Sequence, residues 1–284
     1  MPRYRVLVEY QGTRYSGWQV QRNARTIQGA ILDVLGALAP SGPVDVYGAG
    51  RTDAGVHATG QVAHIDFPLR WPAEDLLSQV NAALPADIRL VDAVRVPPRF
   101  HARHDAVARR YLYLVSRRQT PTVDPFVWRV PARLDTSRMA RAAATLPGMH
   151  DFRGFTADDP SKVSTLVDVQ EVAVLDVGDT IAIRLQASHF LWKMVRRLVG
   201  TLVEVGRGGL TETRFRGYLV DGTSSPPEMT APASGLTLEA VYYPGETQPD
   251  LRTAPLPCRL VGAPPQRGRT ERPPRRRRDR DDRL

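Results

Sequence analysis

Apolar and polar positions in the first part of the chain repeat with the periods of strands and helices. Residues 4–10 alternate between apolar and polar side chains, which predicts a strand. Residues 27–38 repeat apolar positions at intervals of three and four, which predicts a helix, and Thr26 is placed to cap it. Pro72 begins a second predicted helix. Alternation predicts further strands at 61–67, 90–96 and 109–117.

The second half of the sequence has a similar rhythm. Asp135 is placed to cap a helix, and the longest predicted helix covers residues 190–205. The remaining predictions are strands at 167–175, 180–187 and 236–243 and a short helix at 213–220. Helices and strands interleave without the strict alternation of a parallel sheet. The pattern therefore predicts an α+β fold made of two similar halves with antiparallel sheets.

We expect the halves to cover residues 1–106 and 107–248, followed by a Pro/Arg-rich, disordered basic tail at 249–284. The end of this tail, 264–284, holds nine arginines, four acidic residues and four prolines. Such a segment cannot bury enough apolar surface to offset its ordering entropy, so we expect a disordered basic arm. The proline-rich stretch 244–257 is expected to be irregular.

Charge adds a hint about partners. The chain of 284 residues has a net charge of +9, and of its 39 basic residues only Lys162 and Lys193 are lysine. Arginine binds phosphate with two parallel hydrogen bonds and stacks on bases, so this bias suits nucleic-acid binding. A GC-rich genome produces the same excess of arginine.

Cysteine content and hydropathy exclude several classes of protein. The single cysteine, Cys258, excludes a disulfide framework and any multi-cysteine zinc or iron–sulfur site. No run of about 18 apolar residues is present, so no membrane span is expected. Charged residues interrupt the first strand-like segment, which is therefore unlike a signal peptide. We expect a cytoplasmic protein.

Residues 48–57, GAGRTDAGVH, form the most informative segment. Small residues surround Arg51, Thr52, Asp53 and His57, and they allow a ligand to approach the backbone closely. The segment matches neither a phosphate-binding P-loop nor a dinucleotide fingerprint. From this pattern alone, a site built on Asp53 and a plain surface turn fit equally well.

Other polar residues suggest weaker sites. His57, His64, His101 and His104 could serve a metal-dependent phosphohydrolase, but the arginines near them disfavour a divalent cation. Arg109, Arg110 and Tyr111 lie on one predicted strand and could bind a phosphate and stack a base, or Tyr111 could be a core residue. On the longest helix, Lys193, Arg196 and Arg197 lie opposite the apolar stripe, where either a solvated face or a pair with a buried carboxylate is possible.

Several of these segments together resemble the tRNA pseudouridine synthase A family. The most specific is GAGRTDAGVHATGQVAH at 48–64, and the resemblance covers nearly all of residues 4–245. The supporting segments are YQGTRYSGWQVQ (10–21), FHARHDAVARRYLYLV (100–115), FLWKMVRRLVGTLVEVG (190–206) and SGLTLEAVYYP (234–244). The resemblance implies that uridine is isomerised to pseudouridine at positions 38, 39 and 40 of the tRNA anticodon stem-loop. It also implies a homodimer, no metal or other cofactor, and two halves joined into one extended sheet flanked by helices, with a catalytic cleft between the halves.

Site residues follow from the same resemblance. Asp53, in the first half, matches the catalytic aspartate, and Arg51 the neighbouring motif arginine. Tyr111 matches the tyrosine that packs on the target base, and Arg196 the arginine that pairs with the aspartate. Leu236 matches an apolar residue lining the pocket. Asp53 could attack C1′, attack C6 of uracil or take a proton from C2′, and the sequence does not choose among these.

The chain also departs from the family pattern. Gln11 stands where the family commonly has Asp, and His104 and Asp105 replace an apolar and a small residue. Residues 158–168 lack arginines that are common in the corresponding loop. These departures concern how tRNA is held. Besides the metal-dependent phosphohydrolase, a tRNA-binding protein without catalytic activity remains an alternative.

Overall fold

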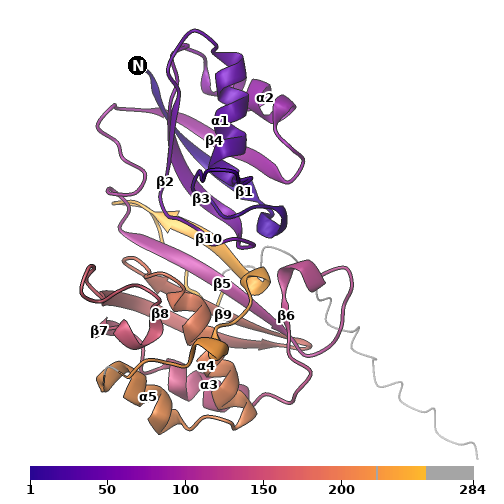
Figure 1. Ribbon diagram of the computed structural model, residues 1–284, viewed down its shortest axis with the longest axis vertical. Coiled ribbons are helices and arrows are strands. Elements are labelled where there is room, and N and C mark those ends of the chain that lie inside the picture. The colour runs from indigo at the N-terminus through magenta and orange to yellow at the C-terminus, as the bar shows by residue number, and fades with distance from the viewer. Residues whose placement is uncertain (222, 254–284) are drawn as a thin grey trace, which may run out of the picture.

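The computed structural model describes residues 1–221 and 223–253, and in this part of the chain one mixed sheet runs the length of the molecule (Figure 1). Its strand order is β4-β1-β3-β10-β5-β9-β8-β7, with β2 paired to β3 and β6 to β5. The extended sheet flanked by helices confirms the expected fold class. The strands are β1 (Arg3–Tyr10), β2 (Asp45–Gly48), β3 (His57–Asp66), β4 (Ile88–Val96), β5 (Ala108–Ser116), β6 (Trp128–Arg129), β7 (Gly148–Asp151), β8 (Leu166–Val177), β9 (Thr180–Ala187) and β10 (Leu236–Tyr242).

Strand β10 joins the two halves of the sheet. It lies between β3 and β5 and pairs with β5 in the antiparallel direction. Its pairing with β3 is parallel, with Thr237 opposite His57 and Leu238 opposite Ala58, and the short β5–β6 pair is also parallel. The expectation of purely antiparallel sheets was therefore wrong at these two places. The chain between β3 and β10 is long enough for the crossover that a parallel pair requires.

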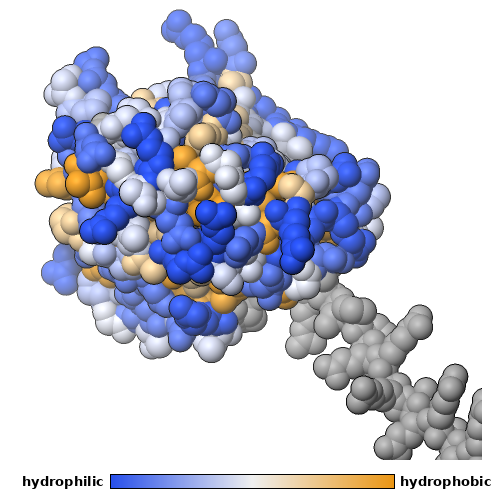
Figure 2. Space-filling view, turned by 90° about the horizontal axis from the view of Figure 1, so that it is seen from below, coloured by the Kyte–Doolittle hydropathy of each residue, from blue (hydrophilic) through white to orange (hydrophobic). Residues whose placement is uncertain are grey.

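Helices occupy both ends of the molecule. In Figure 1, α1 (Ile27–Leu38) and α2 (Ala73–Ala83) lie at the upper end, while α3 (Thr136–Ala143), α4 (Met194–Arg207) and α5 (Glu212–Val220) gather at the lower end. The predicted caps form: the Thr26 side chain accepts from Gly29 N at 3.2 Å, and Asp135 accepts from Arg138 N at 3.0 Å. Figure 2, which looks onto the lower end, shows a mainly hydrophilic surface with small hydrophobic areas. None of the helices in the described residues is both long and apolar enough to cross a membrane.

A single hydrophobic core extends through both halves. On β1, Tyr4, Val6 and Val8 are fully buried, as their alternation predicts, and on β5 the buried Tyr113 and Val115 share the face of Tyr111. The core also contains the apolar stripe of α4. The two halves of the chain therefore pack as one body around the sheet, although their boundaries at 106 and 248 stay predictions.

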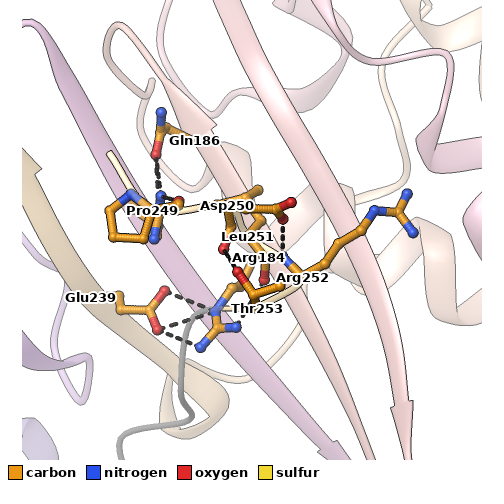
Figure 3. A network of polar contacts seen from close by, with 9 residues as sticks. Arg184, Gln186, Glu239, Pro249, Asp250, Leu251, Arg252 and Thr253 are labelled. Carbon is orange, nitrogen blue, oxygen red and sulfur yellow. Dashed lines mark hydrogen bonds and ion pairs between the residues drawn. The ribbon is translucent and has the colours of Figure 1, made fainter. Parts of the chain in front are cut away.

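The opposite face of the central strands carries a buried polar layer (Figure 3). Arg184 on β9 is fully buried and binds the carboxylate of Glu239 on β10 through Nε and Nη2, at 2.8–3.1 Å. Its Nη1 donates to the carbonyl oxygen of Leu251 at 2.9 Å. Leu251 itself is fully buried. The stretch after Pro244 is thus irregular, as expected, but through Thr253 it packs against the sheet; the rest of the tail, including 264–284, lies outside the described residues.

We expect Glu239→Ala to lower the free energy of unfolding by about 3–5 kcal/mol, because it leaves the fully buried Arg184 without this carboxylate. Urea unfolding followed by circular dichroism measures the change. Glu212→Ala is the matched control: its pair with Arg141 is exposed, so the loss should stay below about 1 kcal/mol. Equal losses for the two variants would contradict a structural role for the buried pair.

Candidate active site between the two halves

The glycine-rich segment forms the loop between β2 and β3. Gly17 packs directly against this loop, because a Cβ atom there would lie 2.5 Å from the carbonyl oxygen of Thr52. Its φ of 89° also favours glycine. Trp18 N donates to the same oxygen at 3.1 Å, and the Tyr10 hydroxyl lies 2.8 Å from Thr52 Oγ1. The loop is therefore held from both sides immediately before Asp53.

The structure brings Asp53 and Arg196 together from the two halves. Arg196 Nη1 donates to Asp53 Oδ2 at 3.0 Å, and the two residues are 143 positions apart in the sequence. The Asp53 side chain is 26% exposed and that of Arg196 17%. The carboxylate is thus paired with a cation and still reachable by a ligand. The sequence left two possibilities for the cations of the longest helix, a solvated face or a pair with a carboxylate. Arg196 forms such a pair.

Backbone contacts aim Arg196 at Asp53. Arg196 Nε donates to the carbonyl oxygen of Ala231 at 2.8 Å, and Ala231 N donates back to the carbonyl oxygen of Arg196 at 3.0 Å. Helix α4 can approach this segment because a Cβ atom on Gly200 would lie only 1.5 Å from the carbonyl oxygen of Met229. The guanidinium therefore bridges a carbonyl and the carboxylate with little freedom to move.

Helix α4 begins later than its pattern predicts. Its first residue is Met194 rather than Phe190, because Lys193 adopts the left-handed conformation at φ 59° and interrupts the helix. Residues 190–192 are therefore free to form a turn, and the Trp192 N–H donates to Asp158 Oδ2 at 2.8 Å. Arg197 does not lie on a solvated face either, because it is half-buried and donates to the carbonyl oxygen of Thr156.

Tyr111 lies in the core beside this pair. It is 8% exposed, and its ring meets Phe190 edge-on with centroids 5.1 Å apart. Burial, with smaller effects of Tyr10 and Asp53, raises the pKa of Tyr111 far above its usual value, so its hydroxyl stays protonated at neutral pH. Leu236 on β10 is 6% exposed and lies opposite Tyr113, while Leu238 lies opposite Tyr111. Tyr111 and Leu236 therefore belong to one apolar wall.

Arg109 and Arg110 make different contacts from those expected. Arg109 is 9% exposed and donates to the carbonyl oxygens of Ala49, Arg103, Ala106 and Ser188. Arg110 points to the opposite face of β5, where it binds Gln186 and the carbonyl oxygen of Pro249. Arg109 thus ties the loop that carries Asp53 to neighbouring loops. A substrate-binding role for these two arginines stays a prediction that their contacts do not favour.

Arg51 is exposed and lines a cavity of about 270 Å³, together with His101 and His104. Asp53 and Arg196 are not among the residues that line it. The histidines of the phosphohydrolase alternative do not meet at one point: His57 is buried elsewhere, between Gly12 N and the carbonyl oxygen of Pro125. Among the described residues no group of three or more His, Cys, Asp or Glu side chains is arranged so that it could hold a metal ion.

Two residues of this site escaped the sequence analysis. Tyr10 was assigned only to a strand face, and Ala231 has no chemistry that a motif could reveal, since it acts through its backbone carbonyl. Of the departures from the family pattern, Asp105 accepts from the backbone N–H of His101 at 2.8 Å, and Gln11 N donates to the carbonyl oxygen of Asp87 at 2.9 Å. Both stabilise loops near the site.

The fold and the site thus define an α+β protein in which an aspartate on the loop between β2 and β3 is paired with an arginine on helix α4, at the other end of the extended sheet. The sequence profile of the family described as tRNA pseudouridine synthase matches residues 6–105 and 142–244. The chain belongs to this family.

Individual relatives align with this chain over nearly their whole length. A tRNA pseudouridine synthase A of Methylobacterium sp. (strain 4-46) is 40% identical over 86% of this chain and 98% of its own. The protein of the same name from Hyphomonas neptunium is 43% identical over 86% of this chain and 99% of its own. That of Cereibacter sphaeroides (strain ATCC 17029 / ATH 2.4.9) is 41% identical over 87% and 99%.

Proposed function

We propose that this protein isomerises uridine to pseudouridine at positions 38, 39 and 40 of the tRNA anticodon stem-loop, with Asp53 as the nucleophile and without a cofactor. The name of the relatives, tRNA pseudouridine synthase A, supports tRNA as the substrate. The observation that carries the proposal is the Asp53–Arg196 pair at 3.0 Å, partly open to solvent and set beside Tyr111.

The chemistry requires little more than this carboxylate. The bond between N1 and C1′ breaks, the uracil turns, and a bond forms between C5 and C1′, while the C5 proton is lost and N1 becomes protonated. Nothing is oxidised or reduced and no group leaves the nucleotide, so the balance needs no redox partner. The guanidinium of Arg196 stabilises the negative charge of Asp53.

A base inside the stem must leave its stack before it can reach Asp53. Extruding a base costs roughly a few kcal/mol, and stacking on an aromatic side chain returns about 1–3 kcal/mol. Tyr111 supplies that ring in our proposal, and Leu236 extends the same apolar wall. Burial raises the pKa of the Tyr111 hydroxyl, which disfavours a role for this group in removing the C5 proton.

Release of tritium from tRNA labelled at C5 of uridine tests the proposal, because the label leaves C5 when this atom becomes bonded to C1′ of the ribose. We expect release that is unchanged by a metal chelator. Activity that disappears with chelator would favour the phosphohydrolase alternative instead. Tight tRNA binding without any release would favour the binding protein.

We also propose that the protein acts as a cytoplasmic homodimer, which rests on the family resemblance. Sedimentation equilibrium of the full chain should give twice the mass of 31.5 kDa. A monomer at all concentrations that support tritium release would contradict the dimer and leave the proposed reaction standing.

Deleting residues 264–284 should weaken tRNA binding and flatten its salt dependence, while turnover at saturating tRNA stays unchanged. The segment carries nine arginines against four acidic residues, and each phosphate that it neutralises adds about 0.7–0.9 to the slope of log K against log salt. Affinities of the full-length and truncated proteins at several salt concentrations measure the effect. Parallel plots with equal intercepts would show that the segment does not touch RNA.

A further inference from the structure

The cavity beside the loop of Asp53 has a lining that the proposed reaction does not use. Its volume is about 270 Å³, several times the ~30 Å³ of one water molecule. Two guanidiniums, Arg51 and Arg103, and two imidazoles, His101 and His104, line it with Tyr47. No carboxylate is among its lining residues, so the cavity suits an anion.

The aromatic groups at this cavity form a connected array. The ring centroids of His101 and His104 are 4.2 Å apart, those of His64 and His101 4.8 Å, and those of Tyr47 and His64 5.0 Å in a stacked arrangement. His104 is exposed, and Tyr47 is 47% exposed. The outer rings of the array therefore offer surface to a flat ligand.

His64 and His101 are neutral rings at this cavity. His101 Nδ1 accepts from the backbone N–H groups of Arg103 and His104, at 3.2 and 3.3 Å, which leaves its proton on Nε2. Burial, with smaller effects of His104 and Arg3, lowers the pKa of His101, and burial lowers the pKa of His64 to about 4. At neutral pH these rings can stack and donate one hydrogen bond, while the arginines supply the positive charge.

The cavity adjoins the proposed catalytic residue along the chain. Gly48, Gly50 and Arg51 line the cavity. Arg51 and Asp53 are two residues apart in the sequence, so their Cα atoms are at most about 7 Å apart. A ligand in the cavity and a uridine at Asp53 can thus belong to one nucleic-acid strand. Because Arg51 and Arg103 are exposed, a phosphate bound between them stays at the surface, where the strand can continue.

We propose that this cavity holds the nucleotide next to the target uridine in the RNA substrate, with its base against His101 and His104 and its phosphate between Arg51 and Arg103. This inference rests on the proposed function and adds a second contact point to it.

The test uses anticodon stem-loop RNA that carries 2-aminopurine on one or the other side of the target uridine, bound to Asp53→Asn protein so that no turnover occurs. Stacking should quench the fluorescence of one of the two probes. Adding His104→Ala should restore the fluorescence and weaken binding about 5- to 150-fold, the effect of losing one stacked base. Adding His104→Phe should retain the quenching, because the ring is kept.

Salt dependence separates the arginine from the histidine. Adding Arg103→Gln should reduce the slope of log K against log salt by about 0.7–0.9, whereas His104→Ala should leave it unchanged. His150→Ala on β7 and Arg216→Gln on α5, at the other end of the sheet, are the matched controls. Unquenched probes at both positions, or equal affinity with and without His104→Ala, would overturn the proposal. Probe fluorescence and RNA affinity are both measured at equilibrium without turnover. They can therefore fail independently of tritium release, which tests the reaction.

Discussion

Replacing Asp53 with asparagine should reduce pseudouridine formation by at least about 10²-fold, the contribution that positioned catalytic groups usually make. Asparagine keeps the size of the side chain and an oxygen that can accept from Arg196 Nη1, but it lacks the negative charge and the nucleophilic oxygen. Affinity for tRNA should not fall, because the change removes a negative charge facing a polyanion. Tritium release and tRNA binding, measured on the same preparation, check both statements.

Asp92→Asn provides the control for this variant, since Asp92 lies exposed on the edge strand β4. It should leave both measurements unchanged. Turnover of Asp53→Asn within about tenfold of wild type would remove Asp53 from its proposed role. A variant that also loses its tRNA affinity or its circular-dichroism spectrum would show instead that the side chain supports the loop.

The strands and helices with long periodic patterns could be predicted from the sequence. Alternation located β1, and apolar spacing with a side-chain cap at Thr26 located α1, because local chemistry decides these elements. The two-residue strand β6 and the four-residue strands β2 and β7 were missed, since so few residues show no period. The parallel pairing of β10 with β3 depends on contacts between distant segments, which periodicity does not encode.

The site, like the fold, could be predicted from the sequence only in part. The small residues around Asp53 mark it as accessible, and a cation on α4 could be suggested as its partner. What periodicity could not show is that Gly200 lets α4 approach the segment with Ala231, whose carbonyl fixes the guanidinium. For Arg109, basic residues beside a tyrosine suggested phosphate binding, and the four backbone carbonyls that its guanidinium binds do not favour that role.

Replacing Arg196 with methionine should lower the single-turnover rate by about 10²-fold. Arg196 positions Asp53, and misplacing a reacting group by about 1 Å can cost a factor of this size. The change also removes the positive charge that stabilises the carboxylate from 3.0 Å away. Methionine keeps the length and apolar stem of the side chain, so α4 should still pack.

Rates under single-turnover conditions provide the measurement, because they report the chemical step rather than product release. Arg207→Met on the same helix is the control: Arg207 is 43% exposed and pairs with Glu204 at the surface, so its rate should match wild type. Arg196→Lys should recover part of the rate, since lysine restores the charge but cannot reach both Asp53 and the Ala231 carbonyl with a planar fork. An Arg196→Met enzyme with a rate within about tenfold of wild type would contradict this positioning role.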